Sequence, residues 1–302
     1  KTTYGVLSRW GVVAYGSSLD QVGLLAHTPG DIAKALSVMA GTDMYDDTSA
    51  DLPNSTELLN LKPYSDEEIS KLKIAIPKQF LESKGLLPDV GTVFTQVQDW
   101  LKAKGAKIDT VDLPVLDASI ASYYVIALSE AASNLSRFDG IRYGSRIDTG
   151  EGYDELYVHT RSEGFGPEVK RRIIIGNYVL SEQFSGDTYK KGMTVRAKIQ
   201  SEMQNLFKDY DIVICPTCPT PAFKLGQKVD NPLEMYLSDL FTTFVNLARI
   251  TSISVPAGLT SKENGSMPVG IQFAGAMFDE LKILKLAQSW ENDHEGCGIP
   301  LK

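Results

Sequence analysis

The stretch LKIAIPKQFLESKGLLPDVGTVFTQVQDWLKAKGAKIDTVDLP, residues 72–114, decides the fold class. It opens with a short apolar run at 72–76 that is typical of a buried strand. Apolar residues then recur at helical spacing, namely Val90, Val93, Phe94, Val97, Trp100 and Leu101. Gly105 predicts the end of that helix, and residues 106–114 return to an extended pattern. Strand, helix and strand in this order predict a parallel pair with a right-handed crossover, and therefore an α/β protein.

The flanking sequence continues the alternation of helices and strands. Helical patterns cover 29–41, 121–138, 167–184, 194–207 and 279–291, while 211–215, 252–256 and 267–275 read as extended runs. Strands near both ends enclose a helix-rich middle. This order predicts one mixed central β-sheet covered by helices, an α/β/α arrangement with a helical flank.

Composition excludes several functional classes. The chain has 302 residues, of which 43% are hydrophobic and 23% charged, as in a soluble globular protein. A net charge of -8 argues against a broad surface for nucleic acid, because phosphate binding requires clustered Lys and Arg. The sequence has no apolar run approaching the roughly 20 residues that span a bilayer, so we expect no membrane segment.

The cysteines predict neither a disulfide framework nor a metal site. Cys215 and Cys218 form a C-x-x-C, but zinc needs two more ligands, and the three histidines are scattered along the chain. The pair follows the apolar run DIVIC and is interleaved with prolines. We interpret it as a strand end followed by a stiff turn, and we predict no bound metal and no cofactor in this chain.

The usual signs of an activated nucleophile are absent from the sequence. There is no G-x-S-x-G, and the cluster AYGSSLDQ, with Ser17 and Ser18, lacks a second glycine to shape a donor loop. We interpret this cluster as a turn. Phosphate-binding glycine motifs are also missing, so nothing indicates nucleotide binding.

Long blocks of the sequence nevertheless resemble a known family. They are residues 1–23, 122–144, 161–181, 215–226, 230–248 and 268–275. Together they resemble the amidase signature family, and within it the A subunits of glutamyl-tRNA(Gln) amidotransferases. SEAASNLSRFDGIRYG and GFGPEVKRRI carry the resemblance to the A subunits.

The resemblance implies an amidase signature fold that is incomplete at the N-terminus, with 1–302 as the C-terminal part of a single amidase domain. In the family, the nucleophilic Ser, a bridging Ser and a Lys base precede the segment that matches Lys1. The resemblance therefore implies no catalytic residue here and an inactive isolated chain. The parent protein would hydrolyse glutamine through an acyl-enzyme and release ammonia for the amidation of Glu-tRNA(Gln).

The resemblance also implies partners and a compartment. The B and C subunits would bind the chain, a partner subunit would use ATP and Mg, and tRNA would be reached only through the complex. The expected compartment is the cytoplasm, with the mitochondrial matrix or a chloroplast as alternatives.

Three residues match positions where the family holds glutamine, namely Tyr123, Arg172 and Asp239. A guanidinium can grip the α-carboxylate, a carboxylate can receive the α-ammonium, and a phenol can add a directional hydrogen bond. Each has a structural alternative. Tyr123 fits a core aromatic, Arg172 fits a solvated basic helix face, and Asp239 fits an N-cap.

The chain departs from the family at a few positions. Thr2 replaces a usual Pro. Arg249 and Thr251 stand where the family tends to have Gly and Pro, so a bulky charge replaces a residue that allows close backbone approach. An aromatic pair expected around Ser185 and Gly186 is missing.

Two other functions remain open. One is an amidase of the same family that acts on a small free amide. The other is an inactive fragment that serves only as a scaffold for the partner subunits.

Overall fold

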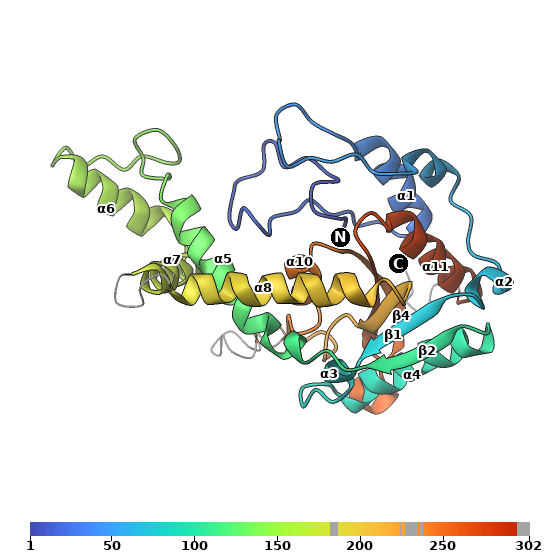
Figure 1. The fold of residues 1–302 in the computed structure, drawn as a ribbon. Helices are drawn as coiled ribbons and strands as arrows, with labels where there is room; N and C mark the ends of the chain where they lie inside the picture. Colours follow the sequence, from blue (N-terminus) through green and yellow to red (C-terminus); the bar gives the residue numbers. More distant parts are fainter. Residues whose placement is uncertain (182–186, 224, 227–234, 236–237, 295–302) are drawn as a thin grey trace. The chain divides into compact units, whose positions relative to one another are not determined.

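The computed structural model describes residues 1–302 apart from 182–186, 224, 227–234, 236–237 and 295–302 (Figure 1). Contacts divide the chain into two compact units. Unit 1 comprises Lys1–Trp10, Gln21–Ile120 and Ala197–Lys302, and unit 2 comprises Gly11–Asp20 and Ala121–Arg196. That all of 1–302 belongs to a single domain stays a prediction.

Unit 1 contains a five-stranded mixed sheet with the order β2-β1-β3-β5-β4. Its strands are β1 (Lys73–Pro77), β2 (Lys107–Val111), β3 (Ile212–Pro216), β4 (Thr251–Leu259) and β5 (Pro268–Gly275). β1 runs parallel to β2 and β3, whereas β5 is antiparallel to β3 and β4. The sequence predictions of these strands, of the parallel pair and of one mixed sheet are confirmed.

Helix α4 (Pro88–Ala103) connects the parallel strands β1 and β2, as predicted. Its periodic residues Val90, Val93, Phe94, Val97 and Leu101 are buried. Trp100 lies at the edge of this face, where its ring meets that of Trp290 edge-on at 5.1 Å. Its indole Nε1 donates a hydrogen bond to Asp293 Oδ2 at 2.9 Å, so the polar atom of the ring is satisfied.

Side chains on the two faces of the sheet pack against different segments. One face contributes Ile74, Ile76, Ile212, Ile214, Ile271 and Phe273 to a core shared with α4, α1 (Pro29–Met39) and α11 (Glu280–Asp293). Because side chains alternate along a strand, Gln272 points to the opposite face. There its amide donates to the carbonyl of Phe241 at 2.9 Å, just before α10 (Thr243–Leu247). Cover on both faces confirms the α/β/α class.

Unit 2 is helical. It contains most of α5 (Ser119–Leu135), α6 (Tyr153–Gly164), α7 (Pro167–Leu180) and the first half of α8 (Asp187–Leu206). Helix α7 packs closely on α5, since a Cβ added to Gly176 would lie 2.0 Å from the carbonyl oxygen of Leu128. The prediction that the middle of the chain is helical is confirmed, and the part of the 167–184 prediction beyond Ser181 lies outside the described residues.

The remaining short elements of the described chain connect these parts. They are η1 (Ser55–Asn60), α2 (Asp66–Ile69), α3 (Lys78–Leu81), η2 (Pro114–Ala118) and η4 (Lys262–Asn264).

The segment Pro114–Leu135 is long and apolar enough to cross a membrane by length and composition alone. This differs from the expectation that no run approaches that length. In the structure 56% of its most apolar window is buried inside the protein, as in a core helix.

Candidate functional site

A tight turn at Tyr15–Asp20 precedes the rest of the candidate site in the sequence and belongs to unit 2. The amides of Leu19 and Asp20 both donate to the carbonyl of Gly16 at 2.7 Å. The carboxylate of Asp20 accepts hydrogen bonds from the amides of Tyr15 and Gly16 at 2.8 and 2.9 Å. The prediction that AYGSSLDQ forms a turn is confirmed, and Asp20 is the residue that closes it.

Side chains from α5 and α8 hold this turn in place. Glu130 accepts a hydrogen bond from the amide of Ser18 at 2.9 Å, and Asn134 donates to the carbonyl of Tyr15 at 3.0 Å. Arg196, which is 2% exposed, donates to both oxygens of Ser18, the carbonyl at 2.7 Å. Because a buried charge needs hydrogen-bond partners, this network fixes the turn relative to the two helices.

Arg172 lies on α7 and is held by two partners. Its Nε donates to Glu168 Oε1 at 2.9 Å, and its Nη1 donates to the hydroxyl of Tyr15 at 3.0 Å. Partial burial lowers the pKa of Arg172, but the hydrogen bonds to Glu168 and Tyr15 raise it, so that the pKa lies above its usual range. Among the described residues the Nη2 atom has no hydrogen-bond partner. The guanidinium is thus oriented along one edge and retains donors on the other.

Sequence reasoning missed both partners of Arg172. Glu168 stands four residues earlier on the same helix, a spacing at which helical side chains meet, so the sequence carried a signal for it. Tyr15 is separated from Arg172 by 157 residues, and no local pattern predicts such a contact.

Tyr123 lies on α5 in unit 2 and is half-buried. Its ring packs edge-on against that of Tyr124 at 5.0 Å between centroids. This position fits the alternative of a packed aromatic and also leaves part of the side chain accessible to a ligand. Its role in binding stays a prediction.

Asp239 belongs to unit 1, so its surroundings are described apart from those of Tyr123 and Arg172. The residue is half-buried, and its backbone carbonyl accepts hydrogen bonds from the amides of Thr242 and Thr243 at 3.1 and 3.2 Å. Thr242 is the N-cap residue of α10 and makes no side-chain cap. The alternative of Asp239 as the N-cap is therefore wrong, because the N-cap position falls three residues later and the helix begins at Thr243. The role of Asp239 in binding stays a prediction.

The structure shows the conformation and contacts of two residues that depart from the family, Arg249 and Thr251. Arg249 has φ 62°, the left-handed region that favours glycine, and its guanidinium lies 4.7 Å from the ring centroid of Tyr4. Thr251 is buried at the start of β4, where its hydroxyl donates to the carbonyl of Lys1 at 3.1 Å. Ser185 and Gly186 lie outside the described residues.

The C-x-x-C begins at the end of β3, as predicted. Burial raises the pKa of the Cys215 thiol to about 12, and the amide of Gln272 donates to its sulfur at 3.2 Å. Cys218 is exposed, and both cysteines are free thiols. A thiol with such a pKa is a poor source of the thiolate that metal binding and redox chemistry require.

A family model described as Amidase matches residues 1–284. The chain belongs to the amidase family. It is 60% identical over 294 residues to the A subunit of the glutamyl-tRNA(Gln) amidotransferase of Treponema denticola, covering 97% of this chain and 60% of that protein. The members of the amidase family are enzymes, and the resemblance read from the sequence is confirmed.

Solved structures of amidase-family proteins share the fold. The glutamyl-tRNA(Gln) amidotransferase A subunit of Thermotoga maritima aligns over 100% of this chain and 59% of its own, with TM-score 0.77 and 34% identity. The allophanate hydrolase of Kluyveromyces lactis aligns over 97% of this chain and 42% of its own, with TM-score 0.72 and 26% identity. The chain spans about 60% of the length of the curated relative from T. denticola.

Proposed function

We propose that this chain forms the substrate-binding part of a glutaminase, the A subunit of a tRNA-dependent amidotransferase. The observation that carries this proposal is the 60% identity to the T. denticola protein of that name. The enzyme hydrolyses glutamine, and the ammonia serves to convert Glu-tRNA(Gln) to Gln-tRNA(Gln).

The geometry around Arg172 supports the proposal. A glutamine substrate carries an α-carboxylate, which a guanidinium recognises best through two parallel N–H donors. Glu168 and Tyr15 occupy Nε and one donor of Nη1, so the Nη1 and Nη2 edge is the one that meets the carboxylate. With 27% of its side chain exposed, Arg172 is accessible to a ligand and fixed in orientation before it binds.

Asp239 and Tyr123 complete the proposed recognition of an amino acid. The carboxylate of Asp239 forms an ion pair with the α-ammonium of the substrate, while the hydroxyl of Tyr123 adds a directional hydrogen bond to the substrate. Both residues are half-buried, which strengthens electrostatic recognition relative to an exposed position. Residues that pair with both charges of the zwitterion select a free amino acid over a simple amide.

The catalytic groups are proposed to lie outside these 302 residues. The Ser nucleophile, the bridging Ser and the Lys base of the family perform the acyl transfer. We therefore expect no glutamine hydrolysis by this chain alone.

The same proposal covers partners and compartment. The B and C subunits bind to this chain, ATP and Mg are used by one of these partners, and tRNA is reached through the complex. The cytoplasm is the proposed compartment, which agrees with the bacterial origin of the relatives.

The test is ammonia release from glutamine by this chain mixed with a separately expressed family segment that carries the Lys and two Ser residues. Activity that Asp239→Ala abolishes supports the glutaminase and its site. No activity from a mixture shown to have assembled contradicts it. Co-purification with the B and C subunits, without activity, would favour a scaffold.

An amidase acting on a small free amide is the second candidate. Similarity to the allophanate hydrolase fold favours it. The same mixture assayed with propionamide distinguishes the two functions, because Arg172 and Asp239 have no zwitterion to bind in that substrate. A preference for propionamide over glutamine would establish the second candidate.

A further inference from the structure

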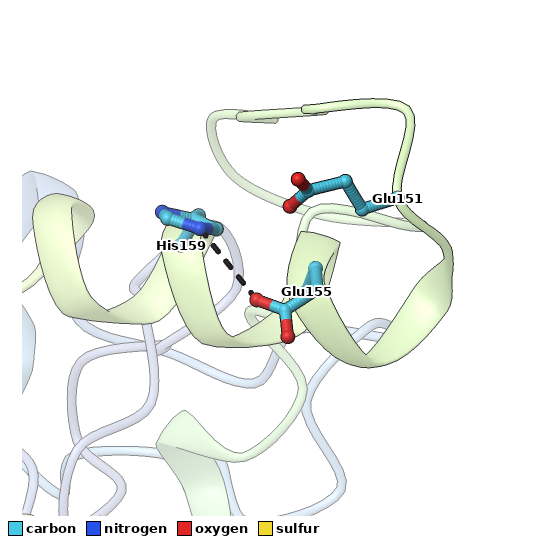
Figure 2. Close-up of side chains that lie close together, drawn as sticks. All are labelled: Glu151, Glu155 and His159. Carbon is cyan, nitrogen blue, oxygen red and sulfur yellow. Dashed lines mark ion pairs between the residues drawn. The ribbon is translucent and has the colours of Figure 1, made fainter.

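Three potential metal ligands converge at the start of α6 in unit 2 (Figure 2). Glu155 and His159 lie one turn apart on the helix, and Glu151 reaches toward them from the preceding loop. One ligand atom from each residue lies within 4.8 Å of the other two. The group combines a helix and a loop, so an ion bound there would join two segments.

The separations between these atoms suit coordination better than direct contact. His159 Nε2 lies 3.6 Å from Glu155 Oε2, which is too long for a hydrogen bond. Two ligands on a tetrahedral zinc ion, with bonds of 2.0–2.2 Å, lie about 3.3–3.6 Å apart. The gap between imidazole and carboxylate therefore has the size of one edge of a coordination tetrahedron. Glu151 is exposed and needs a shift of about 1 Å to complete the geometry.

Two further groups lie next to the three potential ligands. Glu163, the next turn of α6, places its Oε1 3.6 Å from the second ring nitrogen of His159, Nδ1. At this distance Glu163 makes no hydrogen bond, but its negative charge favours a proton on Nδ1 and so leaves Nε2 to the ion. Thr149 donates a hydrogen bond to Glu151 Oε2 at 3.2 Å and so positions that carboxylate.

The cations nearest in sequence are engaged elsewhere. Arg161 donates to the carbonyls of Leu135 and Phe138 at 2.8 and 3.0 Å. Arg146 pairs with Asp148 at 2.7 Å. The three carboxylates around His159 therefore create a negative region that favours a bound cation.

We propose that Glu151, Glu155 and His159 bind one divalent transition-metal ion of the zinc class, with water as the fourth ligand. Imidazole and carboxylate ligands suit zinc. The ion clips the loop to the helix, because Glu151 lies between Gly150 and Gly152, which both have positive φ. Gly152, the N-cap residue of α6, has no side chain to cap the helix. The bound ion would therefore stabilise a helix N-terminus that has no side-chain cap.

The test is calorimetric titration of zinc chloride into the 302-residue chain in a Cys218→Ser, Cys297→Ser background, since thiolates also bind zinc. We expect one ion per chain and no specific binding by His159→Gln. Glu163→Gln should weaken binding, because it removes a negative charge near the ion. His27→Gln, which removes an exposed histidine outside the proposed site, should bind as the background does.

A second readout separates binding from folding. Zinc should raise the melting temperature of the background chain but not that of His159→Gln, and both should melt alike without zinc, because the side chain is on the surface. Equal zinc binding by His159→Gln and the background, or no binding up to about 1 mM zinc, overturns the proposal. None of these outcomes depends on glutaminase activity.

Discussion

The Nη1 atom of Arg172 donates a hydrogen bond to the hydroxyl of Tyr15 at 3.0 Å, joining α7 to a turn 157 residues earlier. Glu168 holds the other side of the same guanidinium. The sequence predicted the position of Arg172 by resemblance, whereas the groups that orient it come from the fold.

Tyr15→Phe should raise the KM for glutamine about tenfold in the reconstituted glutaminase. A hydrogen bond to a charged group contributes roughly 1.5–3 kcal/mol, and its loss frees the guanidinium to rotate. Steady-state kinetics check this, with Tyr157→Phe, an exposed tyrosine of α6, as the control that should change KM less than twofold. Equal effects of the two substitutions would argue against a role for Tyr15.

Gly176→Ala should destabilise the protein by about 2–3 kcal/mol, because the new methyl group would lie 2.0 Å from the carbonyl oxygen of Leu128. Urea denaturation followed by circular dichroism measures this. Gly91→Ala on α4 is the control, since nothing lies within 4 Å of its added methyl group. That substitution should stabilise by about 0.5–1 kcal/mol, and a matching loss in both variants would refute the close approach of α7 to α5.

Arg196→Leu should cost about 2–5 kcal/mol, because it leaves the oxygens of Ser18 without their buried donors. Lys190→Leu, an exposed change on the same helix, should stay within about 0.5 kcal/mol. Denaturant midpoints compare the two. A small effect at Arg196 would show that the turn at Tyr15–Asp20 does not depend on this network.

Asp46 should make the protein more stable at neutral pH than in acid. A hydrogen bond from Thr48, together with that from the amide of Arg9, lowers the pKa of Asp46. A folded-state pKa below the unfolded value stabilises above about pH 4, and this contribution is lost as the pH falls through the folded pKa. The melting temperature of Asp46→Asn should lie below that of the parent at pH 7 and approach it near pH 3. A constant difference at both pH values would contradict this assignment.

Strong periodicity made parts of the fold predictable. The buried residues of α4 recur at helical spacing, and the strands of the sheet are apolar runs. Helix α6 was missed because only Leu156 and Thr160 are buried along it, which gives almost no apolar pattern. Helix α8 was predicted from Thr194 and begins at Asp187, since its first turns are polar.

The candidate site was predictable only in part. Arg172, Asp239 and Tyr123 came from resemblance, because an Arg in a basic helix or a Tyr in an apolar one looks structural by itself. Tyr15 and Arg196 act through contacts across more than 150 residues, which no local pattern encodes. The group at Glu151, Glu155 and His159 is not apparent from the sequence, because only the fold of the loop before α6 brings Glu151 close to the two helical residues.

The most direct test of the central claim compares Arg172→Ala with Arg171→Ala in the reconstituted mixture. Both arginines contact Glu168 from the same helix, but only Arg172 is proposed to bind glutamine. We predict that kcat/KM for glutamine falls at least about 100-fold in Arg172→Ala and less than about threefold in Arg171→Ala. Equal activity of the two variants, in assembled mixtures, would contradict the proposed binding of the substrate carboxylate.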